Sequence, residues 1–127
     1  MPRRTRAIER KLVEATLINV FIVPPEREEE FLANWDRTSE TFRKTGALLE
    51  AHLHRNTEVG DSSFRYVNIA RWTSAEAWRK AHEEYPPTEY QVPGIKGHPS
   101  IYEAHRHVYS EEGAADTGHW IATPARD

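Results

Sequence analysis

The sequence contains no cysteine among its 127 residues. Disulfides, thiolate metal sites, cysteine nucleophiles and iron–sulfur clusters are therefore excluded together. Long hydrophobic runs are also missing, since the longest, Leu17 to Val23, is interrupted by Asn19. It falls far short of the roughly 20 residues that a membrane-spanning helix needs, and no signal peptide precedes it. We therefore expect a cytoplasmic protein that does not act in a membrane.

An excess of charge of one sign is lacking as well. The chain has 17 Lys and Arg residues against 20 Asp and Glu residues, a net charge of −3. This balance does not favour nucleic acid as a partner, and the acidic excess is too small for a disordered acidic chain. With 38% hydrophobic residues, the composition is that of one globular domain able to bury its own core.

The two ends of the chain differ from its middle. Residues 1–12 are rich in arginine, and we predict a flexible N-terminal arm, with an anion-binding arm as the alternative. Residues 110–127 predict a C-terminal tail. The strands and helices that the sequence predicts all fall in residues 13–109, which we expect to form the domain.

The first half of this domain predicts a strand and then a helix. Residues 13–23 are short and rich in β-branched side chains, and two prolines end them. Both faces are apolar apart from Asn19, so we expect a central strand covered on both sides. Residues 25–44 predict a helix with glutamates at its positive end and Gly46 placed for a left-handed cap.

The second half predicts a hairpin of two strands, then a second helix and a last strand. Residues 47–56 alternate in polarity and predict a half-buried strand, and residues 64–72 predict its return strand. The sequence Thr73–Glu76 reads as a capping box that begins a second helix. The proline-rich residues 86–100 predict a long shaped loop, and residues 101–109 predict the last strand.

The element order βαββαβ predicts an α+β fold of the ferredoxin-like type. In this fold a four-stranded antiparallel sheet carries two helices on one face, and the second and fourth strands form opposite edges. The first strand is apolar on both faces, so the second sheet face also needs a cover. A second copy of the chain is the simplest cover, and we therefore expect a homodimer.

Four segments in this order resemble the antibiotic biosynthesis monooxygenase family, whose members form dimeric α+β barrels. They are LINVFIVPPE, EREEEFLANW, ALLEAHLHR and, most specifically, YVNIARWTSAEAWRKAH, and the resemblance covers about residues 15–109. It implies a cofactor-independent oxidation of a quinol, anthrone or polyketide-type phenol by molecular oxygen. Haem-degrading monooxygenases share the fold and are the alternative. Cyclases or isomerases without oxygen chemistry, and non-catalytic ligand-binding dimers, are further alternatives.

Asn68 and Trp72 are four residues apart on a predicted strand, about 13 Å along it, so they share one face with Phe64 and Tyr66. The resemblance implies that this Asn and Trp line the substrate pocket. A neutral amide can stabilise the anion that a phenol forms on losing its proton, and an indole offers a flat wall and an N–H donor. The alternative is that Trp72 is a core residue and Asn68 binds a loop.

His82 lies on the apolar stripe of the second predicted helix, so we expect it to face the same cavity as Trp72. Asn19, Trp72 and His82 match positions that, in haem-degrading relatives, border the haem and supply the iron ligand. An iron ligand, a general base and a core histidine all remain open for His82. The predicted substrate-binding residues are Asn19, Trp35, Phe64, Tyr66, Trp78 and Tyr85.

Two further histidine pairs, His52/His54 and His105/His107, each share one face of a predicted strand. Such spacing is possible metal geometry. The two strands are expected at opposite edges of the sheet, so the pairs could meet only across a dimer. No carboxylate pattern completes a ligand set, and we predict no metal site.

Overall fold

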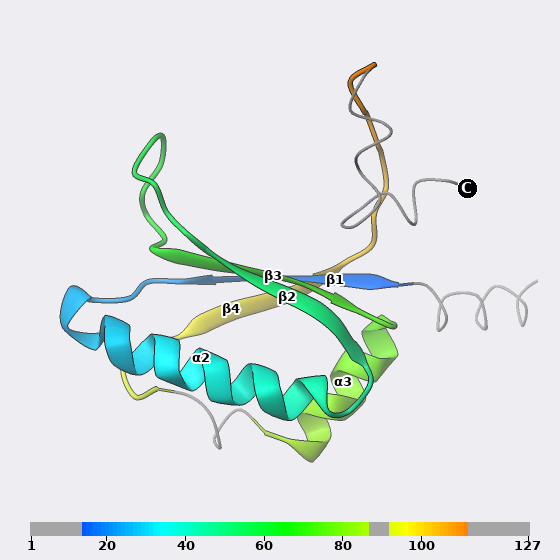
Figure 1. The fold of residues 1–127 in the computed structure, drawn as a ribbon, viewed down its shortest axis with the longest axis horizontal. Coiled ribbons are helices and arrows are strands. Elements are labelled where there is room, and N and C mark those ends of the chain that lie inside the picture. Colours follow the sequence, from blue (N-terminus) through cyan, green and yellow to red (C-terminus); the bar gives the residue numbers. More distant parts are fainter. Residues whose placement is uncertain (1–13, 87–91, 112–127) are drawn as a thin grey trace, which may run out of the picture.

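The computed structural model describes residues 14–86 and 92–111 of the chain. Its elements follow the predicted order βαββαβ, with one short 3-10 turn before the first α-helix (Figure 1). The predicted arm, residues 1–12, and most of the predicted tail lie outside the described residues. The elements are β1 (Ala15–Phe21), η1 (Pro25–Arg27), α2 (Glu28–Arg43), β2 (Leu48–Arg55), β3 (Tyr66–Trp72), α3 (Ala75–Glu84) and β4 (Gly97–Tyr102).

The four strands form one antiparallel sheet in the order β2-β3-β1-β4. This is the predicted ferredoxin-like arrangement, with β2 and β4 at opposite edges. Helices α2 and α3 both lie against one face of the sheet (Figure 1). In the described part of the chain, neither helix is long and apolar enough to cross a membrane.

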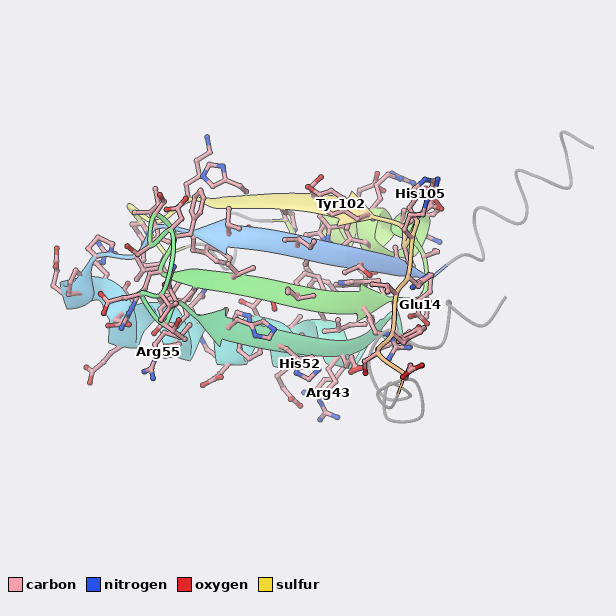
Figure 2. All side chains as sticks on the ribbon, turned by 90° about the horizontal axis from the view of Figure 1, so that it is seen from above. Glu14, Arg43, His52, Arg55, Tyr102 and His105 are labelled. Atoms are coloured by element: carbon pink, nitrogen blue, oxygen red, sulfur yellow. The ribbon has the colours of Figure 1, made fainter. Side chains whose placement is uncertain are left out.

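The described residues leave the opposite face of the sheet open, and Figure 2 looks onto it. At its centre, Ile18 and Val20 of β1 lie opposite Ile69 and Val67 of β3. All four side chains are only partly buried. Strand β1 is thus central, as expected, but the described residues of this chain cover it on one side only.

Strand β4 corrects the prediction for the last strand, which placed it at residues 101–109. The observed strand begins at Gly97, inside the predicted loop, because it pairs with β1 from Phe21 to Thr16. Pro99 is tolerated there because β4 is an edge strand. Residues after Tyr102 leave the sheet, so His105 and His107 do not share a strand face as expected (Figure 1).

Both helices begin slightly differently from the prediction. Residues 25–27 form the 3-10 turn η1, and Gly46 after α2 has the left-handed backbone expected of a cap, with a φ of 78°. Helix α3 is capped by Ser74, whose hydroxyl accepts a hydrogen bond from the Ala77 N–H at 3.0 Å. The predicted capping box, with Thr73 as the cap, is therefore one residue out of register.

The core consists of two buried clusters on the helix-covered face of the sheet. Trp72 has the largest fully buried side chain, and it packs edge-on against Phe42 of α2 with ring centroids 5.7 Å apart. The second cluster surrounds Phe31 near the start of α2. The first cluster comprises Leu17, Phe42, Ala70, Trp72 and Ala81, and the second comprises Val23, Phe31, Tyr66, Val92 and Ile95.

Candidate active site

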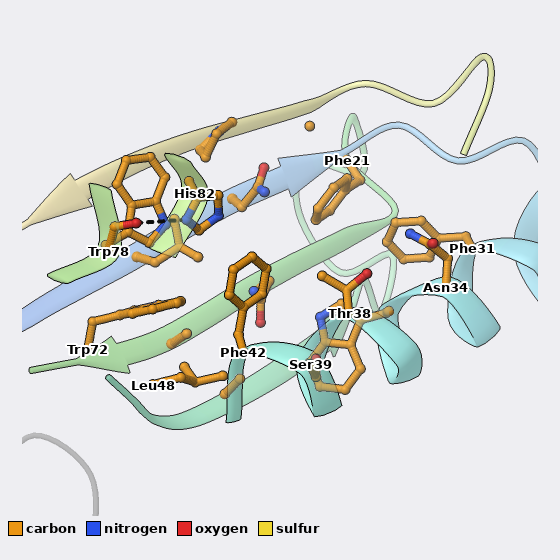
Figure 3. Close-up of a pocket in the computed structure, with 18 of the residues that line it drawn as sticks. Phe21, Phe31, Asn34, Thr38, Ser39, Phe42, Leu48, Trp72, Trp78 and His82 are labelled. Atoms are coloured by element: carbon orange, nitrogen blue, oxygen red, sulfur yellow. Dashed lines mark hydrogen bonds between the residues drawn. The ribbon is translucent and has the colours of Figure 1, made fainter. Parts of the chain in front are cut away.

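A cavity of about 260 Å³ lies between the inner face of the sheet and the two helices (Figure 3). Its volume is slightly below the roughly 300–1,000 Å³ that is usual for small-molecule sites, and its walls are mainly aromatic, as in such sites. Strands β1 and β3 provide its floor. The aromatic side chains that line it are Phe21, Phe31, Trp35, Phe42, Trp72, Trp78 and His82.

Most of the side chains predicted to form the site lie on this cavity. Asn68, Trp72 and His82, the three predicted catalytic residues, all line it. Of the predicted substrate-binding residues, Asn19, Trp35 and Trp78 line it as well. The structure thus brings together side chains from both helices and both central strands.

The other three predicted substrate-binding residues are not among the lining residues. The Tyr66 hydroxyl donates a hydrogen bond to Glu28 at 2.6 Å, which ties β3 to the start of α2. Burial and this bond raise the pKa of Tyr66. Phe64 precedes β3, with its ring 6.5 Å from that of His98. Tyr85 packs edge-on against Phe42.

Two asparagines lie side by side on the cavity floor. Asn19 of β1 and Asn68 of β3 occupy directly opposite positions of the antiparallel pair. The Asn19 Oδ1 accepts a hydrogen bond from the His98 N–H of β4 at 2.7 Å. The Asn68 Oδ1 is buried and has no hydrogen-bond partner within the described chain. The sequence predicted that both asparagines lie on strands, but it did not predict the hydrogen bond between Asn19 and β4.

His82 lines the cavity where Phe42, Trp72 and Trp78 lie around its ring. Its Nδ1 lies 2.8 Å from the Trp78 carbonyl oxygen, the contact drawn in Figure 3. A carbonyl can only accept, so Nδ1 carries the proton and the neutral ring has its lone pair on Nε2. The ring stacks on Phe42 with centroids 4.7 Å apart. Burial lowers the pKa of His82, although the carbonyl contact opposes this shift, so the ring is neutral at pH 7.

Three other buried polar atoms on the cavity residues have no partner within the described chain: the indole nitrogens of Trp72 and Trp78 and the hydroxyl of Thr38. A buried donor left unpaired costs roughly 1–3 kcal/mol, so such atoms mark places where a ligand oxygen would bind. Thr38 is not among the residues that the sequence predicted for the site. Thr41, by contrast, bonds the Arg37 carbonyl of its own helix at 3.2 Å.

The histidine pairs do not build a metal site in the described chain. No group of three or more potential ligand side chains comes together there. The His52 and His54 rings lie 6.3 Å apart on β2, and the nearest acid to His52 is Glu50, with Nε2 and Oε2 3.2 Å apart.

Fold and cavity together define a ferredoxin-like α+β protein with an aromatic pocket between its sheet and helices. Residues 15–87 match the antibiotic biosynthesis monooxygenase family. The chain belongs to this family. No curated protein matches the chain.

Solved structures with the same fold include oxygenases. A candidate monooxygenase from Shewanella loihica PV-4 is 24% identical with a TM-score of 0.66, covering 75% of this chain and 97% of that one. SnoaB, a cofactor-independent oxygenase from Streptomyces nogalater, is 25% identical with a TM-score of 0.55 over 76% and 97%. The haem-degrading protein Rv3592 from Mycobacterium tuberculosis is 21% identical with a TM-score of 0.53, again over 76% and 97%.

Proposed function

We propose that this protein is a cofactor-independent monooxygenase that oxidises an electron-rich quinol, anthrone or related polyketide-type phenol with molecular oxygen. The observation that carries the proposal is the set of buried, unpartnered polar atoms of Asn68, Trp72 and Trp78 around one aromatic cavity. A flat aromatic substrate fits the walls, its hydroxyl can donate to the Asn68 Oδ1, and its other oxygen substituents can accept from the two indole N–H groups. The similarity to SnoaB supports the same class of chemistry.

In this proposal the protein binds, deprotonates and shields a substrate that supplies its own electrons. For an anthrone, the reacting CH₂ becomes a carbonyl, one oxygen atom is retained, and the other leaves as water with both hydrogens. All four electrons come from the substrate, so no external reductant is required. The Nδ2 group of Asn68 donates to the anion formed on deprotonation and stabilises it, and the Trp72 indole orients the ring.

The proton of the substrate goes to His82 Nε2. The contact between Nδ1 and the Trp78 carbonyl holds the ring in the tautomer with its lone pair on Nε2. Its lowered pKa keeps the histidine in this basic form at pH 7. The surrounding aromatic side chains exclude water from the reacting anion.

A haem-degrading monooxygenase is the second candidate, because a histidine with Nδ1 bonded to a carbonyl and its lone pair on Nε2 is also suited to bind iron. His82 would hold the iron, and Asn19 and Trp72 would border the macrocycle. The cavity of about 260 Å³ favours the smaller phenolic substrate. We also propose that the working form is a cytoplasmic homodimer joined through the open sheet face.

Oxygen uptake with anthrone as substrate tests the first candidate. We expect one O₂ consumed per anthrone, and Asn68→Ala should lower kcat by about 10²-fold, as loss of one oxyanion donor does elsewhere. Ser100→Ala, an exposed position on the other face of β4, is the matched control.

A haemin titration tests the second candidate. A Soret band at one haemin per chain that is lost in His82→Ala, without oxygen uptake on anthrones or quinols, would replace the first candidate by the second. Unchanged turnover in Asn68→Ala would show instead that this amide has a structural role only.

A further inference from the structure

Asn19 differs from Asn68 in that a backbone N–H fixes the orientation of its amide. Its Oδ1 accepts from the His98 N–H at 2.7 Å. A backbone N–H can only donate, so turning the amide over would bring two donors together and break this bond. The Asn19 side chain therefore has its Nδ2 group left as a donor.

Gly97 of β4 is the reason that the Asn19 amide fits in this position. A Cβ atom at Gly97 would lie 2.8 Å from the Asn19 Oδ1 and 3.1 Å from its Nδ2. The backbone of Gly97 lies outside the left-handed region, so its conformation alone does not require glycine. The close approach of the amide requires it.

A second contact limits the space at Gly97. The same Cβ atom would lie 2.8 Å from Cε1 of Phe21, whose ring packs edge-on against Phe31 at 4.8 Å. Any test of Gly97 must therefore separate an effect through Asn19 from an effect through Phe21.

We propose that Gly97 is a positioning residue that, together with the His98 N–H, presents the Asn19 amide as a fixed donor to an acceptor oxygen of the substrate. The inference rests on the proposed function, because it assumes an aromatic ligand with an ionisable oxygen. Asn19 and Asn68 lie on opposite positions of neighbouring strands, whose Cα atoms are about 4.5–5.5 Å apart. The two amides therefore lie beside one region of the ligand, and the Asn19 Nδ2 group favours a carbonyl or anionic oxygen at its own position.

Binding of alizarin, a hydroxyanthraquinone dye whose colour reports its ionisation, tests the inference without turnover. Wild type should bind the anion more tightly than the neutral dye. Asn19→Asp keeps the acceptor for His98 but loses the donor, so it should weaken anion binding by about tenfold or more. Gly97→Ala should weaken anion binding similarly and leave binding of the neutral dye nearly unchanged.

A double-mutant cycle identifies the route of the effect. If Gly97 acts through Asn19, Gly97→Ala should cause no further loss in an Asn19→Ala background. Adding Phe21→Leu to Gly97→Ala should not restore binding, and Ser100→Ala on the same strand should bind as wild type does. An equal loss in the Asn19→Ala background, or restoration by Phe21→Leu, would overturn the role of Gly97.

Hydrogen exchange of the His98 amide separates this inference from the proposed function. Protection of that amide should fall in Gly97→Ala and persist in Asn19→Asp, whether or not any dye binds. Full protection in Gly97→Ala would overturn the positioning claim. If wild type binds neither form of alizarin, the proposed function fails, while the exchange result still decides what holds Asn19. If Gly97→Ala does not fold, unchanged anion affinity in Asn19→Asp would by itself overturn the donor role.

Discussion

At His82, two influences act on the pKa in opposite directions. Burial lowers it and is the larger influence, and the contact with the Trp78 carbonyl raises it. The folded protein therefore binds a proton at His82 less readily than the unfolded chain, whose histidines titrate near 6.5. Above that pH, His82 is neutral in both the folded and the unfolded protein, and its protonation takes nothing from the free energy of unfolding. As the pH falls through the folded pKa, the unfolded state is favoured and the free energy of unfolding falls.

We predict that the free energy of unfolding falls between pH 7.5 and pH 5 and that His82→Gln reduces this fall. Urea unfolding at both pH values measures the difference, with His105→Gln, an exposed histidine outside the sheet, as the control. If His82 is also the base, kcat/KM should decline over the same pH range in wild type only. An identical fall in stability in wild type and His82→Gln would contradict the assignment.

Single residues also show how far the sequence predicts the site. Strand periodicity and the family resemblance together placed Asn68 and Trp72 on the cavity. Tyr66 has the same periodicity, yet it lies outside the lining because its hydroxyl reaches Glu28 on another element. The His98 N–H that holds Asn19 is a partner of the same kind. Contacts between residues distant in sequence produce no local sequence pattern, so they could not be predicted.

Among the elements, β4 was the one whose position the sequence missed. Residues 101–109 alternate as a strand does, whereas Gly97 and Pro99 argue locally against a strand at residues 97–100. The decisive factor is the backbone of β1, which pairs with Gly97 to Tyr102. The other strands and both helices were predictable because their polarity patterns and end signals are local.

Helix α3 carries Trp78 and His82 into the cavity, and its start depends on Ser74. This residue is buried, with a relative exposure of 7%, and its hydroxyl accepts a hydrogen bond from the Ala77 N–H. We predict that Ser74→Ala lowers the free energy of unfolding by about 1 kcal/mol, the usual cost of losing such a cap. Thr73→Ala, one residue earlier and exposed, is the matched control and should cost far less. A larger loss in Thr73→Ala, measured by urea unfolding, would restore the capping box that the sequence predicted.

Within the described residues, one face of the sheet has no helical layer (Figure 1). Its apolar centre, formed by β1 and β3, continues outward to Ile22, which is 60% exposed, and Tyr102, which is 51% exposed. At one end of this sheet face, the Arg71 guanidinium forms ion pairs with Glu14 and Glu50, with nitrogen–oxygen distances of 2.6 and 2.8 Å. Monomeric proteins rarely expose contiguous apolar areas of more than a few hundred Å². A second copy of the same face would cover this one with matching apolar side chains, as an isologous interface does.

We therefore predict a stable dimer at micromolar concentration that Ile69→Glu converts to a monomer. Ile69 lies at the centre of the open face, opposite Ile18, so a glutamate there would place an unpaired charge in the interface. Because association stabilises the folded state by mass action, the melting temperature of wild type should rise with protein concentration, and that of Ile69→Glu should not. Leu32→Glu, at an exposed position on α2, is the matched control and should remain dimeric. A wild-type protein that sediments only as a monomer would mean that the open face serves another purpose, and that the cavity works without a partner subunit.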